Sequence, residues 1–334
     1  MLNIPSLIFH LSSLFSIAVS QQEPQVFQIS NAPLRYTVQR TYIGNDFYNL
    51  WIWKTFDDPT HGRVNYVDRQ TSIEKNLTYA SEDKFIMKAD SSEIVPPESR
   101  GRDSIRIESI EPFSEALIIL DLQHAPTGCA TWPAFWTLSQ KGPWPKGGEI
   151  DVIEGVNQNT KNLASLHTLP NCIMPDIRSQ AGQTISNNCD SAFNFNQGCG
   201  VVSVQETSYG SGFNACGGGW YAMERSILGI KIWSFSRCNP PPPELQNPSL
   251  PINTAAWPLP DAFFPFAAES CSYSEHFDPH NMVFDITFCG DWAGNAFPSS
   301  GCGPSECAVF VDQNPGAFSE AYWEINSLRV YTPF

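Results

Sequence analysis

The pattern of apolar and polar residues along the chain predicts β-strands far more often than helices. Residues 104–109 alternate as Ser-Ile-Arg-Ile-Glu-Ser, and residues 282–288 alternate in the same way. A period of two is typical of a strand that buries one face. Residues 117–122 form a short apolar run, and residues 323–325 and 328–331 have the composition of two closing strands. The 27 prolines and 22 glycines fall mostly between these segments, so we expect one all-β sandwich with long loops.

The ten cysteines favour disulfides over a metal site. The chain has no Cys-x-x-Cys motif and its six histidines do not cluster, so zinc is a poor explanation and five disulfides are expected. Strand patterns at 220–224 and 230–235 predict a hairpin, and Cys216 and Cys238 are equally far from its turn. These two cysteines could therefore meet across the hairpin. A second local pair is expected between Cys302 and Cys307.

The first twenty residues have the features of a secretory signal peptide. They carry no charged side chain, contain a largely apolar run, and end in Ala18-Val19-Ser20, which suits cleavage before Gln21. The alternative is a buried N-terminal helix. No later run approaches the roughly 18 apolar residues that a membrane span requires. We therefore expect a secreted, extracellular protein whose residues 21–334 form a single domain, with a possible glycan on Asn76 of the Asn-Leu-Thr sequon.

Composition narrows the class of partner. The formal net charge is -15 and the isoelectric point is about 4.7, which disfavours the basic face that phosphate binding needs. Nucleic acids and anionic membrane surfaces are thus poor partners, whereas a neutral polymer is compatible. Aromatic residues make up 13% of the chain and include ten tryptophans, a high share for a purely structural protein.

The segment Gly-Gly-Glu-Ile-Asp-Val-Ile-Glu-Gly at residues 147–155 places three carboxylates among apolar spacers. The spacers predict a strand, on which Glu149 and Asp151 share a face. Glu154 is five residues from Glu149 and would point the other way, unless a single-residue bulge around Val152-Ile153 restores the alignment. A calcium site and an acidic edge strand are the alternatives. Calcium sites usually draw their acids from loops rich in Asn, Gly or backbone oxygens, which these branched spacers do not suit.

Paired carboxyl groups on one face suit glycoside hydrolysis, which needs one protonated and one ionised acid. Asp151, between the two glutamates, could hydrogen-bond to one of them and keep their proton affinities apart. Trp132, Trp136 and Trp144 lie within thirteen residues, directly before the acidic strand. Indole faces stack on the C–H groups of pyranose rings, so this grouping favours a sugar-lined cleft over ordinary core packing, mainly for Trp136 and Trp144.

These motifs resemble glycoside hydrolase family 16, and above all its secreted fungal endo-1,3(4)-β-glucanases, or laminarinases. The resemblance is carried by Glu-Ile-Asp-x-x-Glu preceded by Trp-Pro-Ala-Phe-Trp, and it extends over most of the mature chain. Other similar segments are Asp-Pro-Thr-His-Gly-Arg-Val-Asn-Tyr-Val at 58–67, Ser-Leu-His-Thr at 165–168, Gly-Gly-Gly-Trp-Tyr at 217–221, Phe-Cys-Gly-Asp-Trp-Ala-Gly-Asn at 288–295 and Ser-Glu-Ala-Tyr-Trp at 319–323.

The resemblance implies a β-jelly-roll sandwich of the concanavalin A-like type, with an open concave cleft and a retaining, double-displacement mechanism. In this chain Glu149 matches the nucleophile, Glu154 the acid/base and Asp151 the assisting carboxylate. The residues that match the cleft lining, and are expected to bind substrate, are Trp136, Trp144, His167, Trp292 and Arg106.

Simpler roles remain open for two of the expected substrate-binding residues. Arg106 could instead form an ion pair with Glu108 or a neighbour, and His167 could be a hydrogen-bonded strand histidine. The expected substrate is a β-1,3-glucan or a mixed-linkage β-1,3-1,4-glucan that is cut internally by a monomer needing no cofactor or metal. A cell-wall β-glucan transglycosylase, with a sugar acceptor in place of water, is the first alternative. A non-catalytic glucan-binding lectin is the second, because jelly rolls often serve that role.

Overall fold

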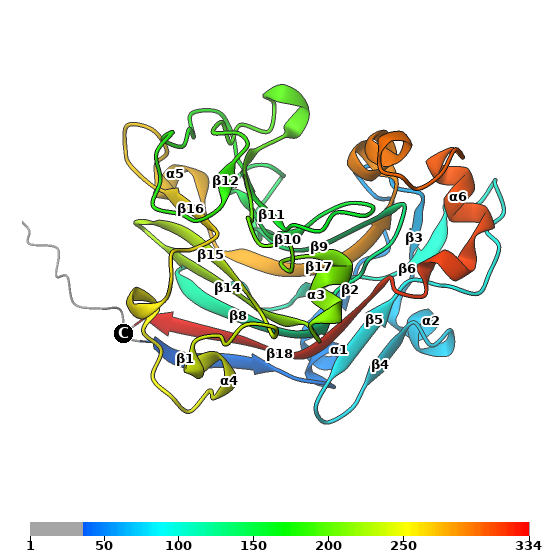
Figure 1. Ribbon diagram of the computed structural model, residues 1–334, viewed down its shortest axis with the longest axis horizontal. Helices are drawn as coiled ribbons and strands as arrows, with labels where there is room; N and C mark the ends of the chain where they lie inside the picture. Colours follow the sequence, from blue (N-terminus) through cyan, green and yellow to red (C-terminus); the bar gives the residue numbers. More distant parts are fainter. Residues whose placement is uncertain (1–35, 334) are drawn as a thin grey trace, which may run out of the picture. The chain divides into compact units, whose positions relative to one another are not determined.

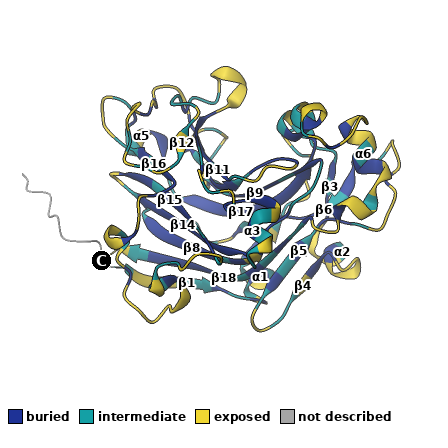
Figure 2. Cartoon of the chain, in the orientation of Figure 1, coloured by how far each residue is buried: buried dark blue, intermediate teal, exposed yellow. Residues whose placement is uncertain are grey.

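The computed structural model describes residues 36–333, so the predicted signal peptide lies outside the described residues. In that range two antiparallel sheets pack against each other as a sandwich, and long loops connect their strands (Figure 1). The expected all-β jelly-roll sandwich is confirmed. Figure 2 shows that the strands of both sheets are mostly buried, whereas the exposed residues gather in the connecting loops.

Each sheet has eight strands. The first sheet runs in the spatial order β16 (Ala262–Pro265), β15 (Gly229–Ser236), β14 (Gly219–Ser226), β8 (Ala116–His124), β18 (Tyr322–Pro333), β5 (Phe85–Lys88) and β4 (Thr78–Ala80), with β1 (Tyr36–Tyr42) also paired to β18. The second runs in the order β12 (Gln183–Thr184), β13 (Cys199–Val202), β11 (Leu163–His167), β10 (Glu149–Glu154), β9 (Thr131–Ser139), β17 (His280–Phe288), β7 (Arg106–Ser109) and β2 (Trp51–Trp53).

The remaining elements are short. A parallel pair, β3 (Val64–Tyr66) and β6 (Arg102–Ser104), flanks the sandwich. The helical segments are α1 (Asp46–Leu50), α2 (Arg69–Glu74), η1 (Asn194–Asn196), α3 (Gly210–Ala215), α4 (Pro243–Gln246), η2 (Thr254–Ala256), α5 (Tyr273–His276), η3 (Gly290–Gly294), η4 (Phe297–Ser299), α6 (Cys307–Gln313) and η5 (Pro315–Phe318). None of these helices has the length and apolar character needed to cross a bilayer.

Aromatic side chains between the sheets fix how they pack. Phe135 on β9 stacks on Phe284 on β17 at 4.4 Å between ring centroids, and Phe284 meets Trp323 of the other sheet edge-on at 5.4 Å. All three are at most 1% exposed. Burying side chains of this size contributes about 1.5–3 kcal/mol each. Because residues alternate along a strand, the neighbours of Phe135 and Phe284 face away from this core, and the functional side chains are found there.

Most predicted strands are confirmed, with two corrections. The alternation over residues 104–109 is divided between β6 and β7, because the chain leaves the parallel pair at Ser104 and enters the second sheet at Arg106. A hydrogen bond of 2.7 Å from Ser104 Oγ to the carbonyl of Ile286 holds this crossing in place. The two closing strands are a single strand, β18, whose register shifts around residues 324–327 against β8. Such shifts let one long strand follow a twisted sheet.

Five disulfides form, as the cysteine count predicts. Cys216 and Cys238 are joined, on either side of the β14–β15 hairpin expected from the sequence. The expected pairing of Cys302 with Cys307 is wrong. Cys302 bonds to Cys129 before β9, and Cys307 bonds to Cys289 after β17. Since Phe288 pairs with Thr131, these two strand ends lie together, and the loop between Cys289 and Cys307 returns to this one edge. The other two bridges join Cys172 to Cys271 and Cys189 to Cys199.

Candidate active site

The predicted bulge in β10 is confirmed, and it turns all three acids to one face of the second sheet. On β9 the residues opposite Glu149, Asp151 and Glu154 are Leu138, Trp136 and Ala134, which are spaced by two. On β11 they are His167, Ser165 and Leu163, again spaced by two. Directly paired residues of antiparallel strands share a face. Both neighbouring strands therefore place the three carboxylates together, with the extra residue taken up at Val152-Ile153.

Asn162 stabilises the bulge from the edge of β11. Its side-chain oxygen accepts a hydrogen bond of 3.0 Å from the Glu154 backbone N–H, and its amide donates one of 2.8 Å to the carbonyl of Val152. Both backbone groups lie at the bulge, where the register shifts, and Asn162 itself is only 4% exposed. Unpaired buried backbone groups are costly, so one side chain satisfies both groups and fixes the direction of Glu154.

Each glutamate receives an indole N–H. Trp144 Nε1 donates to Glu149 Oε2 at 2.6 Å, and Trp132 Nε1 donates to Glu154 Oε1 at 2.8 Å. Trp144 comes from the loop before β10, whereas Trp132 is on β9, so the two tryptophans approach from different elements. Each bond leaves the second oxygen of its carboxyl group available. The acids are thus oriented by rigid side chains that also offer apolar rings beside them.

Asp151 is held more deeply, at 3% exposure, between Ser165 and His167. Ser165 Oγ donates to Asp151 Oδ2 at 2.7 Å, and His167 Nε2 lies 3.4 Å from the same oxygen. The other ring nitrogen of His167, Nδ1, is 2.8 Å from Asn196 Oδ1. With acceptors at both nitrogens, the imidazole is arranged to donate twice, as an imidazolium does. A positive charge therefore sits within the acidic group.

The electrostatics differ between the acids. Burial, reinforced by the charge of Asp151, raises the pKa of Glu149 to about 7 and raises the pKa of Glu154 well above its ordinary range. The two indole hydrogen bonds act in the opposite direction. Although burial alone would lower the pKa of His167, its hydrogen bond to Asp151 and the charges of the surrounding acids raise it to about 10. Burial thus favours the protonated form of both glutamates.

A cation site is geometrically conceivable but chemically poor here. One potential ligand atom from each of Glu149, Asp151 and His167 lies within 4.8 Å of the others. A histidine must be neutral to coordinate a metal, and the raised pKa of His167 opposes the loss of its proton. The imidazolium itself supplies the positive charge that a metal would bring.

On the β9, β17 and β7 side of the acids, aromatic rings enclose Arg106. Its guanidinium lies 4.9 Å from the ring centroids of both Trp136 and Phe56. Its Nη1 atom is 3.4 Å from Asp285 Oδ2. Of the ion pairs considered from the sequence, the one with a neighbouring residue therefore forms, with Asp285, whereas Glu108 pairs with Lys54. Trp136 and Arg106 are thus brought together on the same sheet face as the acids, and Phe56 is 45% exposed beside them.

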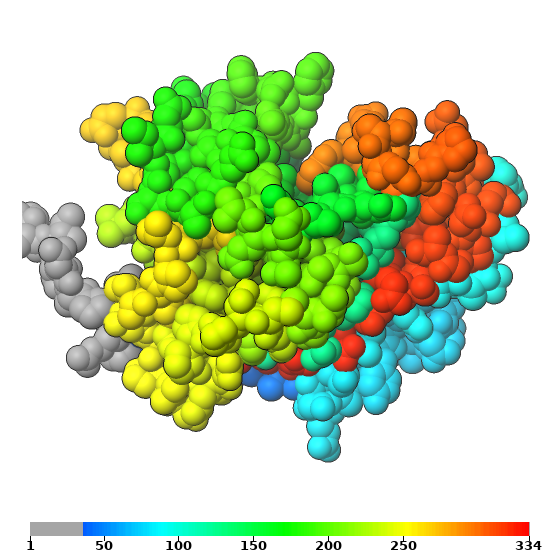
Figure 3. Space-filling view, viewed as in Figure 1, coloured from blue at the N-terminus to red at the C-terminus, as the bar shows by residue number. Residues whose placement is uncertain are grey.

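Trp292 reaches the site through Trp132. The two indoles meet edge-on, with centroids 5.7 Å apart and planes at 88°. Trp292 lies in η3, within the orange segment of Figure 3, and Trp132 binds Glu154 as described above. Figure 3 shows the surface hollowed between this orange segment and the green segment that contains β10 and β11. The structure therefore brings all five predicted cleft residues into or beside the acidic face, Trp292 indirectly.

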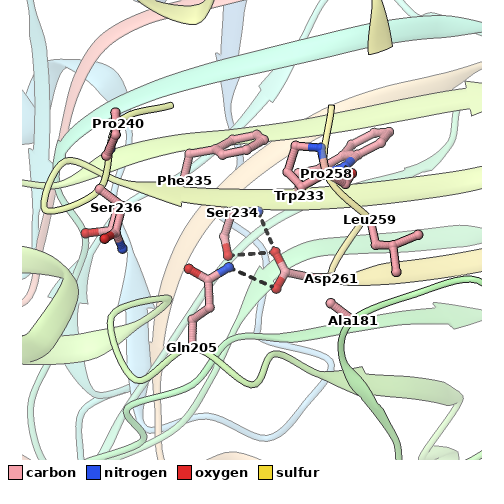
Figure 4. A pocket seen from close by; sticks show the side chains of 11 residues that line it. Ala181, Gln205, Trp233, Ser234, Phe235, Ser236, Pro240, Pro258, Leu259 and Asp261 are labelled. Atoms are coloured by element: carbon pink, nitrogen blue, oxygen red, sulfur yellow. Dashed lines mark hydrogen bonds between the residues drawn. The ribbon is translucent and has the colours of Figure 1, made fainter. Parts of the chain in front are cut away.

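A pocket that none of the three acids lines lies along β15 of the first sheet (Figure 4). Asp261 is its only acidic residue, and its carboxylate accepts hydrogen bonds from Ser203 Oγ, from the backbone and side chain of Ser234, and from Gln205. These contacts satisfy the carboxylate and join loops to a strand. The pocket has a structural explanation and no second ionisable group for catalysis.

The family follows from comparison with known proteins. Residues 51–331 match the family model described as the XgeA-like catalytic domain of glycoside hydrolase family 16. The chain belongs to glycoside hydrolase family 16. The "probable glycosidase C21B10.07" of Schizosaccharomyces pombe is 43% identical over 300 residues, which are 89% of this chain and 69% of that protein. The chain spans about half the length of Aspergillus relatives named probable endo-1,3(4)-β-glucanases.

Solved structures of this family have the same fold. Laminarinase 16A of Phanerochaete chrysosporium, with β-glucans in its donor and acceptor sites, is 46% identical and superposes with a TM-score of 0.86, covering 89% of this chain and all of that chain. An elongating family 16 β-1,3-glucosyltransferase is 36% identical with a TM-score of 0.82 at the same coverage. The glycoside hydrolase fold recognised from the sequence is thus confirmed.

Several residues of this family 16 site do not follow from the sequence pattern. Asn162 and Ser165 act on the acids from β11, and Asp285 supports Arg106 from β17. The residues next to them in the sequence give little sign of these roles, although Ser165 lies in the Ser-Leu-His-Thr segment that resembles the family. Trp132 offered a clearer signal, since it begins the Trp-Pro-Ala-Phe-Trp motif directly opposite the acidic strand.

Proposed function

We propose that this chain is an endo-β-glucanase that hydrolyses internal bonds of β-1,3- and mixed-linkage β-1,3-1,4-glucans with retention of anomeric configuration. The observation that supports this most is the register of β10, which puts Glu149 and Glu154 on one face despite their odd spacing. Retaining glycosidases need two carboxyl groups about 5–5.5 Å apart that act on the same sugar. The names of the fungal relatives and of the laminarinase support the choice of β-glucan.

Glu149 is the proposed nucleophile and Glu154 the proposed acid/base. Glu154 donates its proton to the glycosidic oxygen while a Glu149 oxygen bonds to the anomeric carbon, and the C–O bond to the leaving sugar breaks. A water molecule then gives a proton to Glu154. The oxygen of this water bonds to the same anomeric carbon, and the bond from that carbon to Glu149 breaks. The strongly raised pKa of Glu154 supports its role as the protonated acid. For the nucleophile to ionise, the pKa of Glu149 must stay lower, which the Trp144 bond and His167 favour.

Asp151 and His167 assist this pair. Asp151, which contacts Ser165 and His167, lies between the glutamates, where a negative charge opposes ionisation of both at once. The imidazolium of His167 in turn stabilises the negative charge that Glu149 or Glu154 carries at each stage. His167 is only 7% exposed and both of its ring nitrogens face protein acceptors, so the hydrogen-bonded strand histidine considered from the sequence describes it, and a sugar contact is proposed only for the exposed remainder of its ring.

The five predicted cleft residues are proposed to bind the glucan. Trp136 and the 45% exposed Phe56 offer aromatic rings beside Arg106, and pyranose C–H groups pack on aromatic rings. Trp144 is 46% exposed, so its ring remains accessible while its N–H holds Glu149. Trp292 extends the apolar surface next to Trp132.

Loss of the nucleophile tests the proposal. Glu149→Gln keeps the size of the side chain and should abolish nearly all turnover of laminarin, while Glu82→Gln, at an exposed position remote from β10, should retain wild-type activity. Proton NMR of the first products of the wild-type enzyme should show the β-anomer. Activity of Glu149→Gln within tenfold of wild type, or an α-anomer appearing first, would overturn the assignment.

Transglycosylation is the second candidate function, and the similarity to an elongating β-1,3-glucosyltransferase favours it. The two activities share the glycosyl-enzyme and differ in what attacks it. Products longer than the substrate, formed with excess oligosaccharide acceptor, would reveal transfer. A non-catalytic lectin would release no reducing sugar at all, and it has no use for three clustered acids whose burial is costly.

Secretion, glycosylation and oligomeric state are part of the same proposal. Five disulfides suit an oxidising, extracellular compartment, in keeping with a signal peptide over residues 1–20 and a single mature domain at 21–334. Asn76 is exposed in a turn after α2, where a glycan could project into solvent. We expect a monomer that binds β-glucan without nucleic acid, membrane, metal or cofactor. Mass determination of the secreted protein before and after glycosidase treatment checks the start of the mature chain and the glycan.

A further inference from the structure

The loop of residues 189–199 carries an aromatic side chain with no role in the fold. Phe195 is fully exposed, at 102% of its reference area, and Phe193 in the same loop is 56% exposed. One exposed apolar side chain needs no explanation by itself. Here, however, the backbone that presents it is unusual, because Asn194, Phe195 and Asn196 all have positive φ, at 46°, 57° and 60°. Left-handed conformations are unfavourable for a residue such as phenylalanine, and they persist only where the surroundings enforce them.

Covalent and hydrogen bonds enforce this conformation. The Cys189–Cys199 disulfide closes the loop at its base, and Ser186 Oγ donates to the carbonyl of Gly198. Gly198 has a φ of +63°, and a Cβ there would come within 2.8 Å of the His167 ring. The loop therefore packs directly on His167 because this position is glycine.

The same loop is tied to the catalytic group. Asn196 Oδ1 accepts the hydrogen bond from His167 Nδ1 at 2.8 Å, and His167 approaches Asp151 through its other nitrogen. Phe195 directly precedes Asn196, so their Cα atoms are about 3.8 Å apart. Asn196 and His167 thus connect the exposed ring of Phe195 to Asp151.

The loop lies on the β11 side of the acids, opposite Trp136 on β9. Across the second sheet, Trp136 on β9 and Ser165 on β11 flank Asp151 on opposite sides. Arg106 and Phe56 extend the β9 side, whereas η1, which contains Phe195, lies in the loop that leads into β13, the strand paired with β11 on its far side from β10. A glucan chain that crosses the strands and passes the acids would leave the Trp136 side and run toward this loop.

We propose that Phe195 is a sugar-binding platform that stacks on a glucosyl residue of the β-glucan at the β11 side of the cleft, remote from Trp136. This inference rests on the proposed glucanase function and adds a determinant of substrate length. A ring held in advance by a disulfide-closed loop loses little entropy when a sugar packs on it. The bound residue is not the one being cleaved, so Phe195 is a binding residue and not a catalytic one.

Initial rates on laminari-oligosaccharides of three to seven residues test this inference. Phe195→Ala should lower kcat/KM on the longest substrates by roughly 3- to 10-fold more than on the shortest, the size expected for one lost stacking contact. The preferred cleavage position should also move, because binding on the β11 side no longer helps to align the chain. Phe195→Tyr, which keeps the ring, should behave as wild type.

Ile177→Ala provides the matched control. Ile177 is 92% exposed in a neighbouring loop and has no link to the acids, so its removal should leave every rate unchanged. Equal loss at all lengths would mean that Phe195 only supports His167, and no loss at any length would mean that the ring binds nothing; either result overturns the inference. If the wild-type protein cleaves none of these oligosaccharides, the proposed function fails, and that outcome is distinct from both.

Discussion

The indole N–H of Trp132 donates a hydrogen bond of 2.8 Å to Glu154 from the strand that pairs with β10. Trp144 makes the equivalent bond to Glu149 from a loop, so each glutamate has its own tryptophan. Both bonds favour the ionised form of the carboxyl group and act against burial, which raises both pKa values. Removing one indole N–H should therefore change the pKa of the one glutamate that it binds. The pH dependence of activity can then distinguish the nucleophile from the acid/base.

Trp144→Phe should raise the pKa of Glu149, because the ionised carboxylate loses a donor. In a retaining mechanism the nucleophile must be ionised, so activity falls as the pH drops through its pKa. The acidic limb of the kcat/KM profile should therefore move to higher pH, while the basic limb stays in place. Movement of the basic limb alone would contradict the assignment of Glu149 as nucleophile.

Trp132→Phe should raise the pKa of Glu154 in the same way. The acid/base must be protonated to act, so activity is lost as the pH rises through its pKa, and a higher pKa extends activity to higher pH. The basic limb should therefore shift upward with the acidic limb unchanged. Both profiles are measured on one soluble substrate over the full pH range in which the protein stays folded. A shift of the acidic limb in this variant would show that Glu149 and Glu154 have exchanged roles.

Asn162→Ala should reduce both activity and stability. It leaves the Glu154 N–H and the Val152 carbonyl without partners inside the protein, which costs about 1–3 kcal/mol for each group that water does not reach. The bulge can then relax and turn Glu154 away from Glu149. We expect a loss in kcat of at least about 10-fold with a smaller change in KM, measured together with thermal unfolding. Wild-type kcat in a destabilised protein would show that the bulge holds without Asn162.

Glu149→Gln should stabilise the protein at neutral pH. The folded-state pKa of Glu149, about 7, lies above the ordinary value of 4.5, so the folded state holds the proton more tightly than the unfolded state. This tighter proton binding adds to the free energy of unfolding below pH 4.5, and the added stability is lost as the pH rises toward 7. An uncharged glutamine avoids this loss. Its Tm should exceed that of wild type by about 2 °C or more at pH 7 and match it near pH 4. A Tm at pH 7 below that of wild type would contradict the raised pKa.

The sequence alone predicts the fold class and the acidic face for a local reason. Alternation reveals strands, and the odd spacing of Glu149 and Glu154 requires a bulge if both are to act together. The hairpin that brings Cys216 near Cys238 is equally local. In each case a few neighbouring residues contain the necessary information.

Non-local features could not be predicted in this way. The pairing of Cys302 with Cys129 depends on how a long loop returns to the edge shared by β9 and β17. Asn162 and Asp285 are unremarkable in the sequence, and their roles arise only from the strands that pair with β10 and β7. The division of residues 104–109 between two strands was hidden for a different reason, since both pieces continue the same alternation.

Azide rescue of the glycine variants tests the roles of Glu149 and Glu154 most directly. The substrate is an aryl β-laminaribioside, in which an activated aryl leaving group is attached to the anomeric carbon of laminaribiose. In Glu154→Gly the glycosyl-enzyme still forms on Glu149, so azide should displace it and give the β-glycosyl azide. In Glu149→Gly azide enters the space of the missing nucleophile and should give the α-glycosyl azide while Glu154 protonates the leaving group. Product NMR distinguishes the two anomers. The α-azide from Glu154→Gly and the β-azide from Glu149→Gly, or the same anomer from both variants, would contradict a retaining pair of glutamates on β10 with these roles.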